Sequence, residues 1–335
     1  MSALDHKLKF IIGLLISLVF LFLAFRKVDF GQMGESLRTA NYLYLLPTVA
    51  TIFLSHFLRA FRWRYLLDPI RRLDTKSLFS SLLIGYAANV VTPAHLGEIL
   101  RAYVLSKKRG LSMSATLATV VMERIIDVFS LLALMALALV IYPFPDWVVK
   151  SGFVLFGGTC ALFLILVMLK KSKFFASSSL AFIHRVLPEG LAKRMESVLD
   201  RFLSGIVPLR RWHDYVTVTF LSLVIWGCYG LIFYFCLHLF DFIHAFQLAW
   251  YVSLILLVIT CVAVIVPSSP GYIGPYHYLC QITLAMFSVP AGPALSYATV
   301  VHAITFLPVL LVGLVLANYE GMSIRAASLQ KNHPS

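Results

Sequence analysis

Two long apolar stretches of this chain are each interrupted by a segment rich in proline and glycine, where a membrane helix would have to run unbroken. The interruptions are residues 89–98 (NVVTPAHLGE) and residues 264–274 (VIVPSSPGYIG). Lipid offers no hydrogen bonds to backbone that leaves a helix, so such backbone must be buried in protein or line a polar cavity. Broken segments in both halves of a chain are typical of transporters. The sequence therefore predicts an internal site at the two breaks.

The composition of the chain excludes a soluble globule. Of its 335 residues, 60% are hydrophobic and only 13% are charged, and long apolar runs occur throughout. The five cysteines lie in apolar stretches without the spacing of a metal site or a disulfide framework, which indicates packing residues. The formal charge of +13 comes from Lys and Arg concentrated in short loops beside spans, as in cytoplasmic loops. We therefore expect a membrane protein with no nucleic-acid partner.

The pattern of apolar runs predicts an all-α polytopic fold with about eight spans and re-entrant half-helices. The predicted spans lie near residues 10–28, 42–66, 114–142, 147–169, 215–240, 246–266, 275–289 and 294–317, and residues 77–105 form a broken hairpin. Basic residues flank this hairpin on both sides, so it should enter and leave on the cytoplasmic side. The same rule places both termini in the cytoplasm of a multi-pass protein of the plasma (inner) membrane. The first run lacks a cleavage pattern, which favours a retained helix over a signal peptide.

A single transmembrane domain, residues 1–335, accounts for the whole sequence. Residues 30–142 and 215–317 carry similarly placed breaks, which indicates a possible inverted repeat. Between them, residues 170–213 place apolar side chains at helical spacing among Lys, Arg and Asp. This segment is interpreted as an amphipathic connector on the cytoplasmic surface, either a plain link or a partner-docking or lipid-sensing element.

Charged residues inside the apolar runs are candidates for a binding site. Glu123, Arg124 and Asp127 lie inside an apolar helix, with Glu123 and Asp127 on one face at positions i and i+4. A charge at the centre of a span costs roughly 2.5–3.5 kcal/mol, so such residues should face the bundle interior and pair. The carboxylates would also permit proton coupling. Two interpretations stay open, a substrate site and a structural ion pair between Arg124 and Asp127.

Arginines near the end of the second span favour a phosphate ligand. Arg59 and Arg62 project from one side of a helix at positions i and i+3. Their planar guanidinium groups suit phosphoryl oxygens, and Trp63 is of the type that anchors a span at the interface. A phospholipid or polyprenyl-phosphate head group is therefore a natural substrate. The alternative is that Arg62 and Arg64 extend to the cytoplasmic surface and follow the positive-inside rule.

The first break can add an anion site to these arginines. Thr92 can cap a helix that starts at Pro93, and this half-helix would carry Glu98 and Arg101. Free amides at a helix N-terminus attract anions, so one phosphate could be held by arginines and a helix end together. His95 is more often a hydrogen-bonded structural residue than a ligand.

The second break carries no charged residue, and it is interpreted as a hinge and as part of the wall of the internal site. A further half-helix can start near Pro275 and direct its N-terminus at the same cavity. The candidates here are Pro267, Pro270, Gly271, Gly274 and Tyr276.

Five motifs together carry a resemblance to a known family. In order they are RAFRWRYLL, NVVTPAHLGEILRAYVL, ATLATVVMERIIDVFSLL, VPSSPGYIGPYHY and ALSYATVVHAITFLPVLLVG. The chain resembles the lysylphosphatidylglycerol synthase transmembrane-region family, also called flippase-like domain proteins, over nearly its whole length. The resemblance implies functional positions in the first broken helix, in an E-R-x-x-D helix and in the second break. By motif these are Asn89, Pro93, Gly97, Glu98, Arg101, Glu123, Arg124, Asp127, Pro270, Gly271 and Gly274.

The resemblance separates transport from synthesis. In the multiple peptide resistance factor, a membrane domain like this chain is taken to translocate lysyl-phosphatidylglycerol, and a separate soluble domain transfers lysine. No stretch here has the length or polarity to replace that soluble domain, so we expect no lysyl transfer. Where the family often has an aromatic residue and then Glu or Gln after the last glycine, this chain has Pro275, Tyr276 and His277. Substrate choice should differ accordingly.

Three functions remain in view. The first and preferred one is a lipid translocator that is not an enzyme. The second is a membrane-embedded enzyme, or an accessory subunit, that acts on a lipid-linked substrate with Glu98, Glu123 or Asp127 as base. The third is a non-catalytic lipid-binding scaffold. The sequence has no nucleotide, metal or serine-hydrolase motif, so we expect no cofactor, and a partner enzyme or homo-oligomer is possible.

Overall fold

The computed structural model describes residues 3–26, 28–92, 96–262 and 270–320, and within these ranges the chain is helical and contains no strand. The α-helices and the two short 3₁₀ helices (η) are, in order, α1 (Ala3–Phe25), α2 (Phe30–Thr39), η1 (Tyr42–Tyr44), α3 (Leu45–Leu67), α4 (Thr75–Val91), α5 (Leu96–Arg109), α6 (Met113–Ile141), α7 (Asp146–Lys171), α8 (Lys173–Val186), α9 (Glu189–Gly205), α10 (Trp212–Leu239), α11 (Phe242–Ala245), α12 (Val252–Val262), η2 (Pro270–Tyr272), α13 (Pro275–Ala285) and α14 (Ala291–Tyr319).

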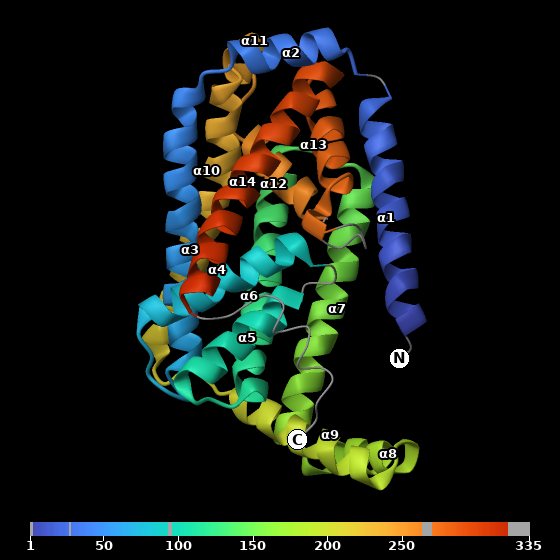
Figure 1. Ribbon diagram of the computed structural model, residues 1–335, viewed down its shortest axis with the longest axis vertical. Coiled ribbons are helices and arrows are strands. Elements are labelled where there is room, and N and C mark those ends of the chain that lie inside the picture. The colour runs from blue at the N-terminus through green and yellow to red at the C-terminus, as the bar shows by residue number, and fades with distance from the viewer. Residues whose placement is uncertain (1–2, 27, 93–95, 263–269, 321–335) are drawn as a thin grey trace.

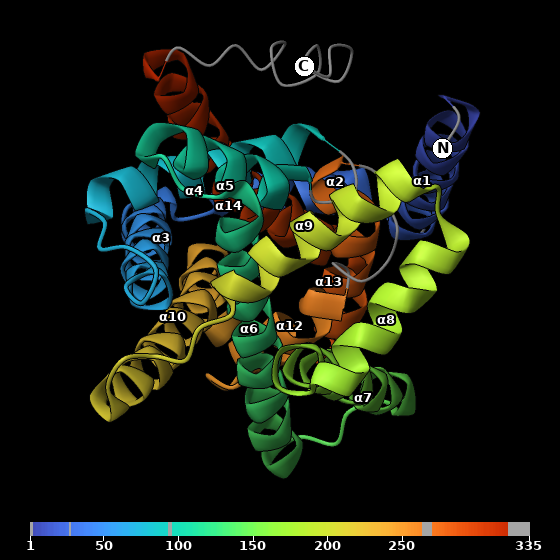
Figure 2. The same cartoon turned by 90° about the horizontal axis from the view of Figure 1, so that it is seen from below.

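The long helices form one bundle with short helices across its two ends. In Figure 1, α3 and α10 lie side by side along one edge, α6 runs through the middle, and α7 and α1 lie toward the other edge. The amphipathic helix α2 crosses one end, and α8 and α9 lie across the opposite end. The view from that end shows α9 passing beneath α6 (Figure 2).

The structure confirms a polytopic all-α membrane protein. Five segments are long and apolar enough to cross a membrane, and all five coincide with predicted spans: Tyr42–Leu67, Met113–Ile141, Asp146–Lys171, Trp212–Leu239 and Ala291–Tyr319. The remaining predicted spans correspond to α1, α12 and α13. The last two have 11 residues each within the described part of the chain, and α13, which ends at Ala285, is about half as long as a bilayer requires. A half-length helix needs neighbours that bury its ends, and in this bundle α13 packs on α12.

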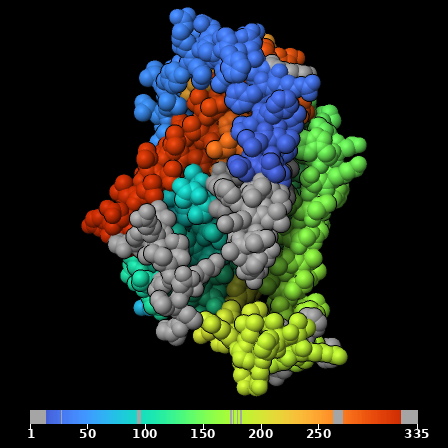
Figure 3. Space-filling model, turned by 45° about the vertical axis from the view of Figure 1, so that its right-hand side comes forward, coloured from blue at the N-terminus to red at the C-terminus, as the bar shows by residue number. Residues whose placement is uncertain are grey.

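The predicted broken hairpin is the pair α4 and α5, whose outer ends meet. Arg109 at the end of α5 pairs with Asp74, the residue before α4, and Arg71 Nη1 donates to the Arg109 carbonyl oxygen at 2.6 Å. α14 packs along α4 so closely that a Cβ added at Gly313 would lie 2.5 Å from the Leu83 carbonyl oxygen. Figure 3 shows α14, in red, beside the hairpin, in cyan and teal. The hairpin thus returns to its starting side, as expected of a re-entrant element.

The inner ends of α4 and α5 are joined through Asn89. Its side-chain Oδ1 accepts a hydrogen bond from the Gly97 amide at 2.8 Å. Gly97 has no room for a side chain, because an added Cβ would lie 1.9 Å from the Gly85 carbonyl oxygen. The Thr92 hydroxyl donates back to the Ala88 carbonyl oxygen at 2.6 Å, so Thr92 ends α4. The helix start predicted at Pro93, and also His95 and Pro267, lie outside the described residues.

The second break is shaped by two glycines in the left-handed region. Gly271 in η2 has φ +73° and Gly274 has φ +103°, conformations that side chains disfavour. A Cβ at Gly274 would also lie 2.5 Å from the Ser17 carbonyl oxygen of α1. Pro275 is the first residue of α13, as predicted. The two breaks come together here, since η2 packs against α4 and the Gly271 Cβ position is 3.8 Å from the Val90 carbonyl oxygen.

The segment between the two halves forms two helices, α8 and α9, rather than one. Gly205 of α9 packs on α6 so closely that a Cβ would lie 2.3 Å from the Ala115 carbonyl oxygen. Leu191, Met195 and Val198 of α9 are exposed at helical spacing. α9 is therefore amphipathic, as predicted. The cytoplasmic location of this segment and the division into repeat halves stay predictions, although each half has a long helix, a broken pair and a second long helix in the same order.

Candidate functional site

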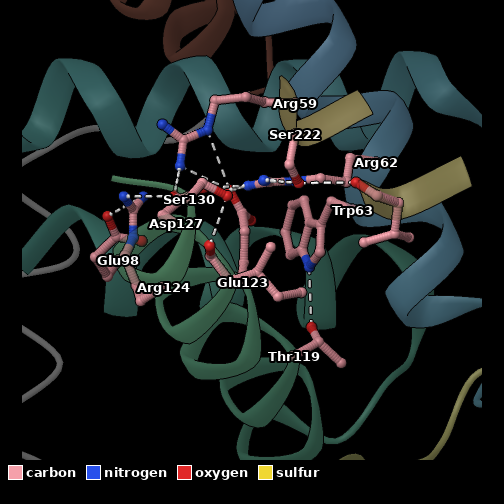
Figure 4. A network of polar contacts seen from close by, with 12 residues as sticks. Arg59, Arg62, Trp63, Glu98, Thr119, Glu123, Arg124, Asp127, Ser130 and Ser222 are labelled. Carbon is pink, nitrogen blue, oxygen red and sulfur yellow. Dashed lines mark hydrogen bonds and ion pairs between the residues drawn. The ribbon is translucent and has the colours of Figure 1, made fainter. Parts of the chain in front are cut away.

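Charged side chains from three helices form one buried group next to the first break (Figure 4). The polar cluster, as we call it, consists of Arg59 and Arg62 of α3, Glu98 and Arg101 of α5, and Glu123, Arg124 and Asp127 of α6. The structure therefore brings together seven of the nine substrate-binding candidates from the sequence. Four guanidinium groups face three carboxylates, which leaves the cluster with a formal charge of +1.

Glu123 is the centre of the polar cluster. Its side chain is fully buried, and its Oε1 accepts hydrogen bonds from Arg59 Nε at 3.1 Å and Arg59 Nη2 at 2.9 Å. Arg62 Nη2 lies 3.4 Å from the same oxygen, and Arg101 Nη1 donates to Oε2 at 3.0 Å. A buried carboxylate needs such partners, because its desolvation is otherwise unfavourable by several kcal/mol. One side chain thus joins α3, α5 and α6.

Asp127 repeats this pattern one helical turn later. Arg62 Nη2 donates to its Oδ1 at 2.6 Å, Arg59 pairs with its Oδ2, and Arg124 Nη1 lies 3.3 Å from Oδ2. The predicted shared face of Glu123 and Asp127 is therefore correct. The open alternative of an isolated Arg124–Asp127 pair is excluded, since both residues belong to a larger network.

The polar cluster is accessible at its edge near the first break. Arg124 Nη2 lies 2.7 Å from Glu98 Oε1, and Arg101 Nη2 lies 2.8 Å from Glu98 Oε2. The Arg124 side chain is 37% exposed and that of Glu98 is 18% exposed, whereas Arg62 and Glu123 are fully buried. A ligand would therefore meet Arg124 and Glu98 first.

Trp63 corrects one expectation from the sequence. It was expected to anchor α3 at the membrane interface, but its side chain is fully buried. Its Nε1 donates to Thr119 Oγ1 at 2.9 Å, and the Arg101 guanidinium lies 5.0 Å from its ring centroid. Positions 59, 62 and 63 share one helix face, so the tryptophan points inward with the arginines. Arg62 is likewise not a surface residue, whereas Arg64 is exposed.

Sequence reasoning missed the uncharged partners of the polar cluster. Arg59 Nη1 donates to the Tyr229 hydroxyl at 2.8 Å, and Arg62 Nη1 donates to Ser222 Oγ at 2.8 Å. Both acceptors lie on α10, seven residues apart and hence on one face. Arg124 Nη2 lies 3.4 Å from the Tyr86 hydroxyl of α4. The i, i+7 spacing of hydroxyl groups in an apolar span was the available signal.

The polar cluster has more hydrogen-bond donors than acceptors. The Nε atoms of Arg62, Arg101 and Arg124 are buried and have no acceptor among the described residues. A buried donor without a partner costs roughly 1–3 kcal/mol. An anion with several oxygens would remove both this deficit and the excess positive charge. Within the described part of the chain, no group of three His, Cys, Asp or Glu side chains could hold a metal ion.

The other candidates from the sequence support the breaks and do not join the polar cluster. Asn89 binds backbone, and Gly271 and Gly274 shape the second break. Tyr276 lies in the first turn of α13, where its ring centroid is 5.3 Å from that of His302 and 6.0 Å from that of His277. Pro270 lies in η2, and Pro93 and Pro267 fall outside the described residues.

In a comparison with known protein families, residues 10–313 match the family described as the lysylphosphatidylglycerol synthase transmembrane region. A UPF0104 membrane protein of Methanothermobacter thermautotrophicus is 33% identical over 113 residues, 33% of each chain. A UPF0104 membrane protein of Methanocaldococcus jannaschii is 30% identical over 118 residues, 34% of this chain and 35% of the relative.

A third relative has an enzyme's name. The glycosyltransferase AglD of Haloferax volcanii is 25% identical over 138 residues, which cover 41% of this chain and 22% of the relative. The chain thus matches about a third or less of the length of each of these curated relatives. No solved structure matches.

Proposed function

The chain belongs to the lysylphosphatidylglycerol synthase transmembrane-region family, and on that premise we propose that it is a lipid translocator of the flippase or scramblase type. Its substrate is a phospholipid or a polyprenyl-phosphate lipid. The phosphate binds at the polar cluster while the apolar tails stay in the bilayer. The protein lies in the plasma (inner) membrane with both termini in the cytoplasm.

The observation that carries this proposal is the excess of guanidinium groups over carboxylates in the polar cluster. A structural network of ion pairs would be expected to match charges and hydrogen bonds, but here four arginines meet three carboxylates and three Nε atoms lack an acceptor. Arginine binds phosphate through paired N–H groups. A phosphate at Arg101 and Arg124 would supply acceptors for two of these three Nε atoms.

The position of the polar cluster favours movement over simple binding. It lies where α4 ends and α5 begins, and the second break packs against the same end of α4. Helix ends that meet inside a membrane bundle are typical of transporter sites, where they face the bound substrate. The partly exposed pair of Arg124 and Glu98 would form the entrance to this path.

The test is movement of fluorescent phospholipids in proteoliposomes. We compare the wild type with Arg124→Gln, because Arg124 is the most exposed arginine of the polar cluster and its loss should leave the buried network folded. Arg64→Gln is the matched control, an exposed arginine of α3 outside the polar cluster. We expect Arg124→Gln to slow lipid movement at least about tenfold, the equivalent of 1.4 kcal/mol lost from a charged contact, and Arg64→Gln to match the wild type. Equal rates in all three proteins would contradict the proposal.

A second candidate function is an enzyme, or an accessory subunit of one, that acts on a lipid-linked substrate. The similarity to a glycosyltransferase over 138 residues favours it. In that case Glu98, the partly exposed carboxylate of the polar cluster, is the candidate base. Turnover of a polyprenyl-phosphate sugar by wild-type protein that moves no lipid, with loss of turnover in Glu98→Gln, would favour this function. Lipid binding without movement or turnover would leave the third candidate, a non-catalytic scaffold.

A further inference from the structure

The exposed apolar side chains of α9 form one stripe along the helix. Leu191, Met195 and Val198 follow one another at spacings of four and three residues, and Phe202, which is partly buried, continues the line. The opposite face carries four exposed polar residues, Lys193, Ser197, Asp200 and Ser204. A helix with one apolar side and one hydrated side of this kind is typical of the membrane interface.

The stripe faces the side of α9 on which the membrane-spanning helices lie. Leu191, Val198 and Gly205 are seven residues apart and therefore share one face. At Gly205 this face touches α6, where an added Cβ would lie 2.3 Å from the Ala115 carbonyl oxygen. α6 runs from this contact into the bundle, while α9 extends across the end of the bundle (Figure 2). The exposed part of the stripe is therefore turned toward the bilayer, and the polar face toward water.

α9 also lies at the level where membrane spans end. Ala115 is in the first turn of α6, and Lys170, in the last turn of α7, donates hydrogen bonds to the carbonyl oxygens of Leu203 and Ile206. Trp212 is the first residue of α10 and is exposed, and tryptophan is enriched at membrane–water interfaces. These span ends place α9 at the height of the lipid head groups.

Two arginines follow one edge of the stripe. Arg194 and Arg201 come three residues after Leu191 and Val198, respectively, which puts both arginines beside the stripe on the same edge. Both are exposed, and neither forms an ion pair with another described residue. The whole segment of residues 170–213 has nine Lys and Arg but three Asp and Glu, a formal charge of +6. An anionic lipid surface attracts such a segment.

We propose that α9 docks on the membrane in which the protein lies and binds its anionic phospholipids. The apolar stripe enters the boundary between head groups and acyl chains, and the guanidinium groups of Arg194 and Arg201 bind lipid phosphates. This lipid site lies outside the polar cluster, and it does not depend on the proposed function.

A protein partner, or a second copy of the chain, fits α9 less well than lipid does. A partner in the aqueous phase would meet the polar face of α9, because the stripe is turned toward the bilayer. A partner that covered the stripe would have to displace the head groups at the ends of α6 and α7. Phosphate groups are already present at this height, and they are natural ligands of unpaired guanidinium groups.

The first measurement is hydrogen exchange of the backbone amides of residues 191–204 in the full chain. The protein is reconstituted in nanodiscs of phosphatidylcholine alone, or with about one third of the lipid replaced by phosphatidylglycerol. Undocking must precede exchange of these amides if α9 rests on the membrane. We expect protection to be at least about fivefold higher in the anionic discs, because these add the attraction of the arginines to that of the stripe.

Two double variants test the role of the arginines. In Arg194→Gln with Arg201→Gln the difference between the discs should fall below about twofold. Lys150→Gln with Lys193→Gln is the matched control, since it removes two charges from the far end of α7 and the polar face of α9, and it should keep the difference. Exchange in α6 and α10 shows whether each variant is folded. Equal protection of the wild type in both discs, or a difference that persists without the two arginines, would overturn the proposal.

The second measurement locates the stripe itself. A spin label is attached at Met195→Cys, on the stripe, or at Ser197→Cys, on the polar face, and labelled wild type supplies the background from the native cysteines. In anionic discs, collisions of the label with oxygen, which concentrates in lipid, are compared with collisions with a water-soluble nickel chelate. We expect this ratio to be at least about threefold higher at position 195 than at position 197. Equal ratios would mean that the stripe lies outside the bilayer, as it would against a protein partner, and would overturn the proposal.

Discussion

The first break, between α4 and α5, adjoins seven charged side chains, whereas the second, between η2 and α13, is surrounded by histidine, tyrosine and glycine. The first is held by ion pairs that join three helices, and both ends of its hairpin are closed by hydrogen bonds. The second contains two left-handed glycines, and His302 Nε2 lies 2.6 Å from the carbonyl oxygen of Gly271.

The two breaks differ in the kind of contact that holds them. Many buried polar contacts fix the first break, so its geometry can be preorganised for an anion. The described part of the second break is fixed by packing instead, since a Cβ at Gly274 would lie 2.5 Å from the Ser17 carbonyl oxygen and α13 packs on α1, α12 and α14. Ion pairs and hydrogen bonds therefore hold the first break, whereas close backbone packing holds the described part of the second.

The largest expected effect tests whether the ion pairs of the polar cluster hold the first break. Glu123→Gln leaves several buried guanidinium groups facing a neutral amide, and loss of one partner of a buried ion pair costs about 3–5 kcal/mol. We expect a loss of unfolding free energy of that size in an SDS titration. Glu35→Gln, which breaks an exposed pair with Arg38, is the control and should change it by less than about 0.5 kcal/mol. A loss below 1 kcal/mol for Glu123→Gln would show that α3 and α5 do not depend on this carboxylate.

Disturbing the tight packing at the first break should give the next largest loss of unfolding free energy. Gly97→Ala would force α4 and α5 apart, because its Cβ meets the Gly85 carbonyl oxygen and Asn89 Oδ1. We expect a loss of about 3 kcal/mol in the same titration. Gly34→Ala, at an open position of α2, should instead stabilise the protein by up to about 1 kcal/mol. Similar values for the two variants would refute the close contact of the half-helices.

A change of backbone conformation at the second break should lower the free energy of unfolding by somewhat less. Gly274→Ala combines φ +103° with a contact to the Ser17 carbonyl oxygen, and we expect it to cost about 2 kcal/mol. Gly110→Ala has φ +62° but open space, so about 1 kcal/mol is expected there. If Gly274→Ala is the milder of the two, the second break is not pressed against α1.

The smallest effect concerns a contact that joins the two halves. Glu320, just after α14, pairs with Lys108 of α5 and accepts a hydrogen bond from Ser80 of α4 at 3.0 Å. Burial acts to raise its pKa, but these hydrogen bonds lower it below the ordinary value.

Because its pKa is lowered in the folded protein, Glu320 stabilises the folded state fully above the pKa of the unfolded state. This effect is lost as the pH falls through the lower pKa of the folded state. The side chain is partly exposed, so we expect less than about 1 kcal/mol. The melting temperature of Glu320→Gln should lie below that of the wild type at pH 7, with a smaller difference near pH 3. A constant difference would assign the effect to packing.

Much of the fold could be read from the sequence, because hydropathy and helical spacing act locally. The apolar runs gave the long helices, and the i, i+3 and i, i+4 spacing of Arg59, Arg62, Glu123 and Asp127 put them on inward faces. The burial of Trp63 was missed because a tryptophan near basic residues also fits an interfacial anchor. Partners such as Tyr86 of α4 and His302 of α14 depend on how distant helices pack, which no local pattern encodes.

The central place of Glu123 has a genetic consequence. In an ordinary ion pair, exchanging the two residues restores the attraction, so a lost charge can be rescued by one compensating change. Glu123 is shared by Arg59, Arg62 and Arg101 on two other helices. An exchange with Arg101 would place the new cation against Arg59 and Arg62. Suppressor screens starting from Glu123 variants should therefore return reversion to Glu rather than second-site charge swaps.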